Sequence, residues 1–258
     1  MSEERAKLYD ENSDFVYQMG VSLMDNDLLP KDGECILDLG CGTGRLTARL
    51  ASKVGLRGNV LGVDPNAGRI ELARTNAQRH HQNIRFVVGL VDDMLSLGPY
   101  NGIFSNYVLH WVPDGSIHET LRGALACLKP GGLLCAHIAL SPKALFEDIE
   151  RLVTGNETPP TPQYIPGEAG AKWKSMCELA GFDVSVAAEE SARACLDNLD
   201  TCINVVRAYL DTHASGYAIM DNDVSSLMKA HGIKSRSDKV VTESNYVRLI
   251  AHKSPEGQ

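Results

Sequence analysis

The amino-acid sequence predicts a doubly wound α/β fold, in which helices cover both faces of a mainly parallel sheet. Between residues 34 and 140, short apolar runs alternate with segments of helical period, and this alternation is typical of such a sheet. A glycine-rich loop follows the first apolar run, and an aspartate ends the second. With 258 residues, 43% of them hydrophobic, the chain is long enough to form one large domain over 1–258.

The cofactor-binding core of this fold is expected in residues 34–140. Its strands are predicted at 34–39, 59–64, 84–88, 102–106 and 132–139. Between the first two, Leu46, Leu50 and Val54 recur at a four-residue step, as the residues on one face of a helix do. A further helix is predicted over 116–128, because the proline and two glycines that follow it end a helix.

Beyond residue 140 the alternation weakens. The proline-rich segment 158–167 is predicted to be a surface loop or lid, because proline has no place inside a sheet. Residues 182–188 and 239–253 are rich in β-favouring side chains and are predicted strands. Residues 191–238, between them, have a helical pattern. We expect this insertion to form a helical cap together with the N-terminal region 1–30.

Charge and cysteine content exclude several classes of partner. Asp and Glu outnumber Lys and Arg by 33 to 25, which gives a formal net charge of −8. Such a surface repels phosphate backbones and anionic lipids, so we expect neither a nucleic acid nor a membrane as partner. The seven cysteines lack the paired spacings of metal sites, and no metal is predicted. The sequence has no secretory signal, and a reducing, cytoplasmic location is expected; the oligomeric state is left open.

The loop after the first strand is suited to a cofactor. Asp38 ends the strand, and glycines at 40, 42 and 44 lead into a helix. Glycine tolerates positive φ and has no Cβ, so a ligand can lie against this turn at the carboxyl end of the strand. Asp64 stands twenty residues after Gly44, at the end of the second strand, where its carboxylate can accept both hydroxyl hydrogens of a ribose.

Two cofactors that contain ribose differ in charge. A dinucleotide brings a pyrophosphate and requires the spacing G-x-G-x-x-G, whereas this chain has G-x-G-x-G. The charge of Asp38 would oppose a pyrophosphate but would favour a ligand with an ammonium and a sulfonium group, which is S-adenosylmethionine. As a single residue, Asp38 is also compatible with a turn-capping role. An NAD-dependent dehydrogenase and a catalytically silent protein of this fold are the more remote alternatives.

These motifs resemble those of the class I S-adenosylmethionine-dependent methyltransferases. The resemblance covers residues 34–140: segments 38–44, 63–65 and 128–132 are similar to the family's first motif, its second motif and the segment before its fifth strand. It implies a Rossmann-like sheet of seven strands whose last strand, 245–251, is antiparallel. It also implies a cofactor site made of Asp38, Gly40, Cys41, Gly42, Gly44, Asp64, Pro65, Asp92, Asp93 and Asn106. Either Asp92 or a backbone group is expected to contact the adenine.

The segment from Asn106 to Asp114 is expected to face the methyl donor. It lacks the Asp/Asn-Pro-Pro-Tyr run of enzymes that methylate adenine or glutamine nitrogens. Its pattern Asn-x-x-Leu-His-Trp-Val-Pro-Asp, together with residues 8–13, is similar to carboxyl methyltransferases of the trans-aconitate type, to insect juvenile hormone acid methyltransferases and to the malonyl-carrier-protein methyltransferase of biotin synthesis. The resemblance implies methyl transfer to a small-molecule carboxylic acid, giving a methyl ester.

The catalytic candidates are His110, Trp111 and Tyr9. A carboxylate is ionised at neutral pH and needs orientation rather than a base. A phenol or amine acceptor would need a base, for which His110 is the candidate, with a pKa expected near the working pH. His110 and Trp111 are also compatible with plain core packing. Arg207 and Tyr209, in the inserted helices, are weaker candidates for neutralising a substrate carboxylate.

Overall fold

The computed structural model of the chain describes residues 3–78, 80–90, 98–140, 144–155, 164, 167–210 and 219–255. Its strands are β1 (Cys35–Leu39), β2 (Asn59–Asp64), β3 (Ile84–Val88), β4 (Tyr100–Asn106), β5 (Leu128–Ala139), β6 (Asp183–Leu196) and β7 (Val240–His252). They form one sheet in the order β3-β2-β1-β4-β5-β7-β6. The first five strands pair in parallel, and β7 is antiparallel to both of its neighbours. The predicted doubly wound seven-stranded fold with an antiparallel last strand is confirmed.

The helices of the described residues are α1 (Glu3–Asn12), α2 (Asp14–Leu23), α3 (Arg45–Val54), α4 (Ala67–Ala73), α5 (Ile117–Cys127), α6 (Ala144–Thr154), α7 (Ala169–Ala180), α8 (Leu199–Tyr209) and α9 (Asp221–Ala230). Short π-helical turns extend α2 over Met24–Leu28 and α4 over Arg74–Gln78. None of these helices is both long and apolar enough to span a bilayer.

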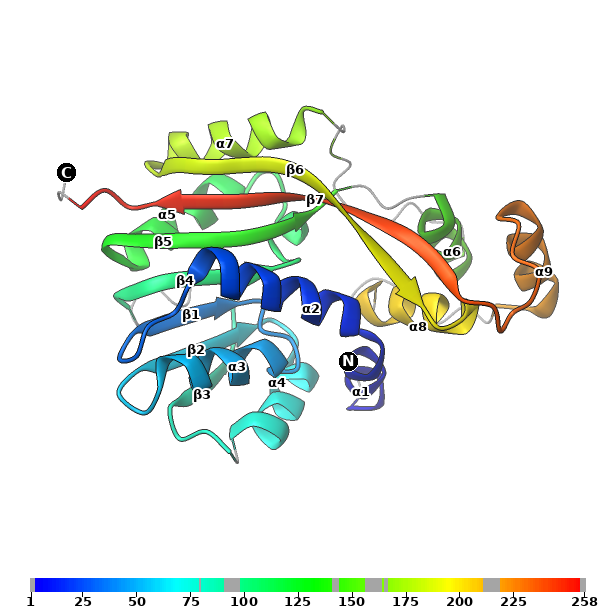
Figure 1. Cartoon of the computed structure of the whole chain (residues 1–258), viewed down its shortest axis with the longest axis horizontal. Coiled ribbons are helices and arrows are strands. Elements are labelled where there is room, and N and C mark those ends of the chain that lie inside the picture. Colours follow the sequence, from blue (N-terminus) through cyan, green and yellow to red (C-terminus); the bar gives the residue numbers. More distant parts are fainter. Residues whose placement is uncertain are drawn as a thin grey trace.

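Helices cover both faces of the sheet (Figure 1). On one face, α2, α3 and α4 pack against strand residues such as Ile36, Val60 and Phe104. On the other face, α5 and α7 pack against Leu37 and Val63. Side chains alternate between the faces of a strand, so consecutive residues such as 36 and 37 enter different cores. The sheet is therefore buried on both sides, and only its strand ends are open to ligands.

The strands β6 and β7 run beyond the sheet and carry a third group of elements (Figure 1). Their pairing continues from Asp183↔His252 to Leu196↔Val240. Helices α6, α8 and α9 pack on the far end of this ribbon around a core of their own. We call α6, α8, α9 and the ribbon residues 189–196 and 240–247 the cap.

Two predicted boundaries are wrong. The strand expected over 182–188 continues to Leu196, so the first residues of the predicted helical insertion 191–238 are strand, and the helices follow as α8 and α9. The small and charged residues of 189–196 have little β propensity alone, but pairing with β7 holds them extended. The strand expected to begin at residue 132 begins at Leu128. Of the proline-rich segment 158–167, only Tyr164 and Gly167 are among the described residues.

Candidate active site

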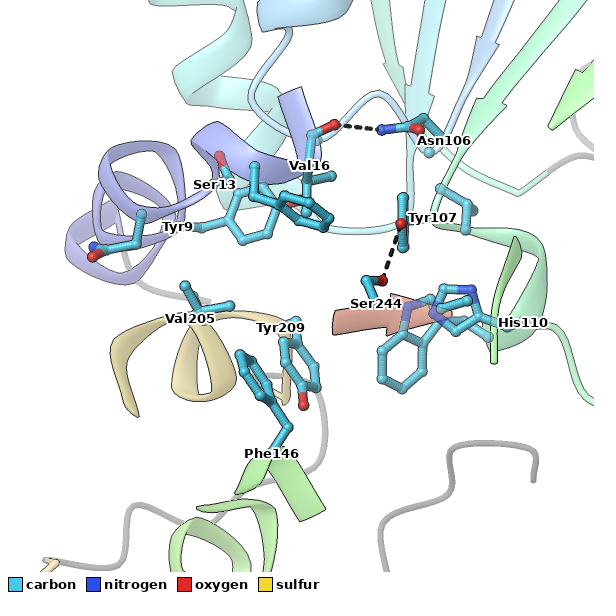
Figure 2. A pocket seen from close by; sticks show the side chains of 18 of the residues that line it. Tyr9, Ser13, Val16, Asn106, Tyr107, His110, Phe146, Val205, Tyr209 and Ser244 are labelled. Carbon is cyan, nitrogen blue, oxygen red and sulfur yellow. Dashed lines mark hydrogen bonds between the residues drawn. The ribbon is translucent and has the colours of Figure 1, made fainter. Parts of the chain in front are cut away.

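A cavity of about 470 Å³ opens at the carboxyl ends of β1, β2 and β4, between α1 and the cap. This volume lies in the ordinary range of small-molecule sites. Figure 2 shows its walls: Tyr9, Ser13 and Val16 on one side, and the cap side chains Phe146, Val205 and Tyr209 on the opposite side. The cavity is thus enclosed by segments that are far apart in the sequence.

The glycine loop forms one wall of the cavity. Gly40 has a φ of +75°, and a Cβ there would lie 2.1 Å from a methyl carbon of Val108. Gly42 has a φ of +55°, and it lines the cavity opposite the ring of Tyr9. Gly44 does not line the cavity; a Cβ there would lie 2.8 Å from the ring of Phe86. Gly44 therefore serves packing, Gly40 allows the close approach of Val108, and Gly42 has space for a ligand beside it.

Asp64 is the buried acid of the cavity, with 4% of its surface exposed. Its Oδ2 accepts a hydrogen bond from the Gly42 N–H at 3.1 Å, and its Oδ1 accepts one from the Asn66 N–H at 2.8 Å. Burial raises the pKa of this carboxyl, whereas the charge of Arg69 and the two amides lower it. The amides fix the direction of the carboxylate, whose remaining lone pairs are available to a ligand.

Asp38 lies behind the glycine loop and does not reach the cavity. Its side chain is buried, and its Oδ2 accepts a hydrogen bond from the Thr47 hydroxyl at 2.6 Å. Burial is the main reason why its pKa rises to about 7, and the nearby Asp64 raises it further. Asp38 is not among the residues that line the cavity, and neither is Cys41, which is also buried. Both residues support the loop from behind.

Helix α1 is attached to the glycine loop by two side chains. The Thr43 hydroxyl donates to the Asp10 carboxylate at 2.5 Å, and the Arg45 guanidinium donates to the Asp10 carbonyl at 3.1 Å. Arg45 also pairs with Asp14 at 2.7 Å. These contacts place Tyr9 over the loop, where it lines the cavity as predicted.

The end of β4 carries two polar side chains into the cavity. Asn106 donates from Nδ2 to the Val16 carbonyl at 2.9 Å, which fixes α2 against the sheet (Figure 2). The next residue, Tyr107, has a φ of +58°, a conformation that is strained for a non-glycine residue. Its hydroxyl lies 3.1 Å from the Ser244 hydroxyl of β7. This pair of hydroxyls faces the cavity from two strands.

His110 and Trp111 lie together in the lining of the cavity, with ring centroids 5.0 Å apart. His110 is only 4% exposed, and its Nδ1 is buried without a hydrogen-bond partner among the described residues. Burial lowers its pKa to about 3. The sequence-based expectation of a pKa near the working pH is therefore wrong, because an imidazolium here would be removed from water without a counter-charge.

The cap contributes a buried carboxyl to the lining of the cavity. Glu150 of α6 is 4% exposed and lines the cavity, and the Tyr209 hydroxyl of α8 donates to its Oε1. Burial raises the pKa of the Glu150 carboxyl, and the hydrogen bond from Tyr209 lowers it. The ring of Tyr209 lies 6.1 Å from that of Trp111. The rings of Trp111 and Tyr209 thus form an aromatic wall between His110 and Glu150.

The charges of the lining suit a cationic ligand. Within the described residues, the lining carboxyls are Asp64, Glu150 and Glu243, and Arg69 is the one Lys or Arg side chain. The ammonium and sulfonium groups of S-adenosylmethionine fit this balance better than the pyrophosphate of a dinucleotide does. The glycines at positive φ in the loop and the oriented Asp64 carboxylate fit the same ligand. Within the described part of the chain, no cluster of His, Cys, Asp or Glu side chains is arranged to hold a metal ion.

The predicted site residues are only partly brought together. Tyr9, Gly40, Gly42, Asp64, Pro65, Asn106, His110 and Trp111 line the cavity. Asp92 and Asp93 lie outside the described residues, so the adenine contact stays a prediction. Arg207 does not line the cavity, whereas Tyr209 does.

Sequence reasoning missed Arg69, Glu150 and Phe146. Arg69 had a signal: it is the third residue of α4, and a cation is unfavourable at the positive end of a helix dipole. Its presence there calls for a compensating partner, which the structure supplies in Asp64 and Tyr9. Glu150 and Phe146 gave no such signal, because an acid and an aromatic on an amphipathic helix are ordinary.

Comparison with known proteins agrees with this geometry. Residues 36–132 match the family model described as a methyltransferase domain. An arsenite methyltransferase of Aquipseudomonas alcaligenes is 35% identical over 129 residues, 46% of this chain and 37% of that protein. A trans-aconitate 2-methyltransferase of Deinococcus radiodurans is 38% identical over 104 residues, 40% of this chain and 37% of that protein. The chain thus spans well under half the length of these relatives.

Solved structures extend the likeness of the fold to most of the chain. The YcgJ protein of Bacillus subtilis superposes with a TM-score of 0.63 at 15% identity, over 93% of this chain and 100% of that protein. At this identity the likeness concerns the fold alone. Residues 36–132 are therefore similar in sequence to a methyltransferase domain, and most of the chain shares the fold of the YcgJ protein.

Proposed function

We propose that the protein transfers the methyl group of S-adenosylmethionine to a small molecule held between Trp111 and the cap, and that the acceptor atom is a carboxylate oxygen. The observation that carries this proposal is that one cavity is lined both by the glycine loop with Asp64 and by His110 with Trp111. The residues proposed to bind the donor and the acceptor therefore line the same cavity. Enclosure excludes water, which would otherwise solvate the attacking atom.

The cofactor is held, in this proposal, by residues of the first two strands. Gly40 and Gly42 leave room along the loop, and Asp64 accepts the ribose hydroxyls. When bound, S-adenosylmethionine supplies an electrophilic methyl group. The side chains of the chain then have to place the acceptor in line with that methyl group and exclude water.

His110 supports an acceptor that needs no base. With a pKa of about 3, its imidazole is neutral at physiological pH and is a weak proton acceptor. It retains one N–H donor and one acceptor nitrogen. A carboxylate is already nucleophilic, and the neutral donors of His110, Tyr107 and Ser244 are suited to orient it. The alternative, a phenol or amine with His110 as base, loses its expected basic group.

The test is product identification with a panel of carboxylic acids, phenols and amines. Methyl esters are recognised by mass spectrometry and by their hydrolysis in alkali, whereas methyl ethers and methylamines survive. Asp64→Ala should lose on the order of 2 to 3 kcal/mol of cofactor binding. Asp183→Ala, at an exposed position at the start of β6, is the matched control and should bind as the wild type does. Turnover confined to phenols or amines would refute the carboxylate assignment, and unchanged cofactor affinity in Asp64→Ala would refute the site.

A further inference from the structure

Glu150 is a buried acid that the proposed methyl transfer does not use. It lies on α6, in the cap, and its neighbours along the helix, such as Ile149 and Val153, are buried in the apolar core of the cap. The Tyr209 hydroxyl occupies Oε1, and no hydrogen bond to Oε2 occurs within the described residues. The residue is 4% exposed, yet its Oε2 is not among the buried polar atoms that lack a partner, so this oxygen keeps contact with solvent at the cavity that Glu150 lines. A carboxylate oxygen with free lone pairs in such a place is suited to accept a hydrogen bond from a ligand.

A continuous aromatic surface separates Glu150 from the methyl-transfer end. The ring of Trp111 lies 5.0 Å from that of His110 and 6.1 Å from that of Tyr209. Phe146, one turn before Glu150 on α6, projects beside Tyr209 into the same space (Figure 2). Aromatic walls of this kind favour a flat or apolar ligand body.

The opposite end of this surface is also polar and unpaired. His110 keeps its Nδ1 buried without a partner among the described residues. A ligand that bridges the two ends would pair His110 at one end and Glu150 at the other. Arg69 is the one Lys or Arg side chain of the described lining, and it is not among the groups that shift the pKa of the Glu150 carboxyl. A second carboxylate on the ligand would therefore meet Glu150 without a neutralising cation beside it.

We propose that Glu150 selects acceptors that carry a hydrogen-bond donor, a hydroxyl or an ammonium group, at the end distant from the methylated atom, with an apolar or aromatic body between. This inference rests on the proposed methyl transfer and names the class of acceptor for it. It excludes polycarboxylates, because the distal site is itself acidic. Glu150 is thereby a specificity residue and takes no part in the transfer.

The competing role for Glu150 is structural, since its bond to Tyr209 joins α6 to α8. Two variants separate the roles. Tyr209→Phe breaks the same hydrogen bond but keeps the carboxyl, whereas Glu150→Gln keeps the shape and removes the negative charge. Melting temperatures of both variants report any loss of cap packing.

The experiment is calorimetry on the full chain saturated with S-adenosylhomocysteine, so that no turnover is needed. The probes are 3-phenylpropanoate and its analogues with a 4-hydroxyl or a 4-aminomethyl group on the ring. The wild type should bind the two substituted acids roughly tenfold or more tightly than the parent, as expected for a hydrogen bond to a charged group. Glu150→Gln should abolish that preference, and Tyr209→Phe should keep it.

The outcomes are distinguishable. A wild type without the preference, or binding of none of the three acids, overturns the inference. So does an equal loss of affinity for all three acids in both variants, which would mean a structural role only. Affinity for S-adenosylhomocysteine is measured first in each protein. If the wild type fails to bind it, the proposed function falls as well, whereas normal binding with no distal preference removes the Glu150 assignment alone.

Discussion

The guanidinium of Arg69 lies over the ring of Tyr9, 4.4 Å from its centroid. The same guanidinium donates to the Ala208 carbonyl at 3.1 Å. One side chain of α4, close behind Asp64 in the chain, thus contacts both covers of the cavity, helix α1 and helix α8. A partly desolvated cation–π contact of this kind contributes about 1 to 2 kcal/mol.

Arg69→Ala should therefore weaken the contacts that hold both α1 and α8 at the cavity. We expect weaker retention of S-adenosylhomocysteine, by roughly tenfold, and faster amide hydrogen exchange in α1 and α8. Calorimetry and exchange mass spectrometry measure the two effects. Arg122→Ala, at an exposed position of α5, is the control for loss of one positive charge. Unaltered exchange in α1 would contradict the coupling.

The pKa of Asp38 predicts a pH dependence of stability. Its rise to about 7 means that the folded protein binds this proton more tightly than the unfolded chain, whose Asp pKa is 3.8. The free energy of unfolding therefore decreases as pH rises from about 4 to about 7. Asp38→Asn keeps an acceptor for Thr47 and carries no charge, so it lacks this decrease. Urea unfolding of both ligand-free proteins should show a difference that grows over this range, on the order of a few kcal/mol in total. Parallel profiles would contradict it.

We expect that the titration of His110 does not contribute to the pH–rate profile. Because its pKa is about 3, the imidazole stays neutral from pH 5 upward. His110→Phe keeps a ring of similar shape without nitrogen atoms, and we expect roughly a tenfold higher KM for the acceptor at unchanged pH dependence. A wild-type limb near pH 6.5 that disappears in the variant would instead identify His110 as the base.

In Gly40→Ala, the steric clash of the added Cβ can be measured separately from the backbone strain. Gly40→Ala places a Cβ 2.1 Å from a Val108 methyl carbon at a φ of +75°. Gly131 has the same φ, and a Cβ there meets nothing within 4 Å. Gly131→Ala should therefore cost only the strain, about 1 to 2 kcal/mol, and Gly40→Ala clearly more. The melting temperatures of both single variants, and of Gly40→Ala combined with Val108→Ala, measure the excess. Equal losses at the two glycines would contradict the close approach.

The core of the fold was predictable because its signals are local. The apolar runs ending at Leu39 and Asp64, and the glycines between them, specify strand, turn and helix without help from distant residues. The extension of β6 to Leu196 had no local signal, because its pairing with Val240 joins residues that are remote in sequence. Tertiary pairing overrode the propensity there.

Several residues predicted for the site line the cavity, but their environments were not predictable from the sequence. His110 and Asp38 were identified as candidate residues, but their pKa values follow from burial in the folded chain, and the Thr47 hydrogen bond opposes the rise in the pKa of Asp38. Glu150 was out of reach, since only the folding of α6 onto α8 brings it to the cavity. Sequence motifs identify the residues at the strand ends, whereas the opposite wall of the cavity forms by packing between residues that are far apart in the sequence.

The ribbon of β6 and β7 carries one wall of the cavity away from the strands that bear the glycine loop and Asp64. Its paired strands leave the sheet near Glu189↔Val247 and carry α8 and α9 between them. The remaining cap helix, α6, packs onto α8 and α9 as a second short segment. In the proposed function, a two-piece graft of 144–154 and 190–246 from a protein of the same fold would replace the cap wall of the acceptor site. Tyr107, His110 and Trp111 would stay with the half that is proposed to hold the donor.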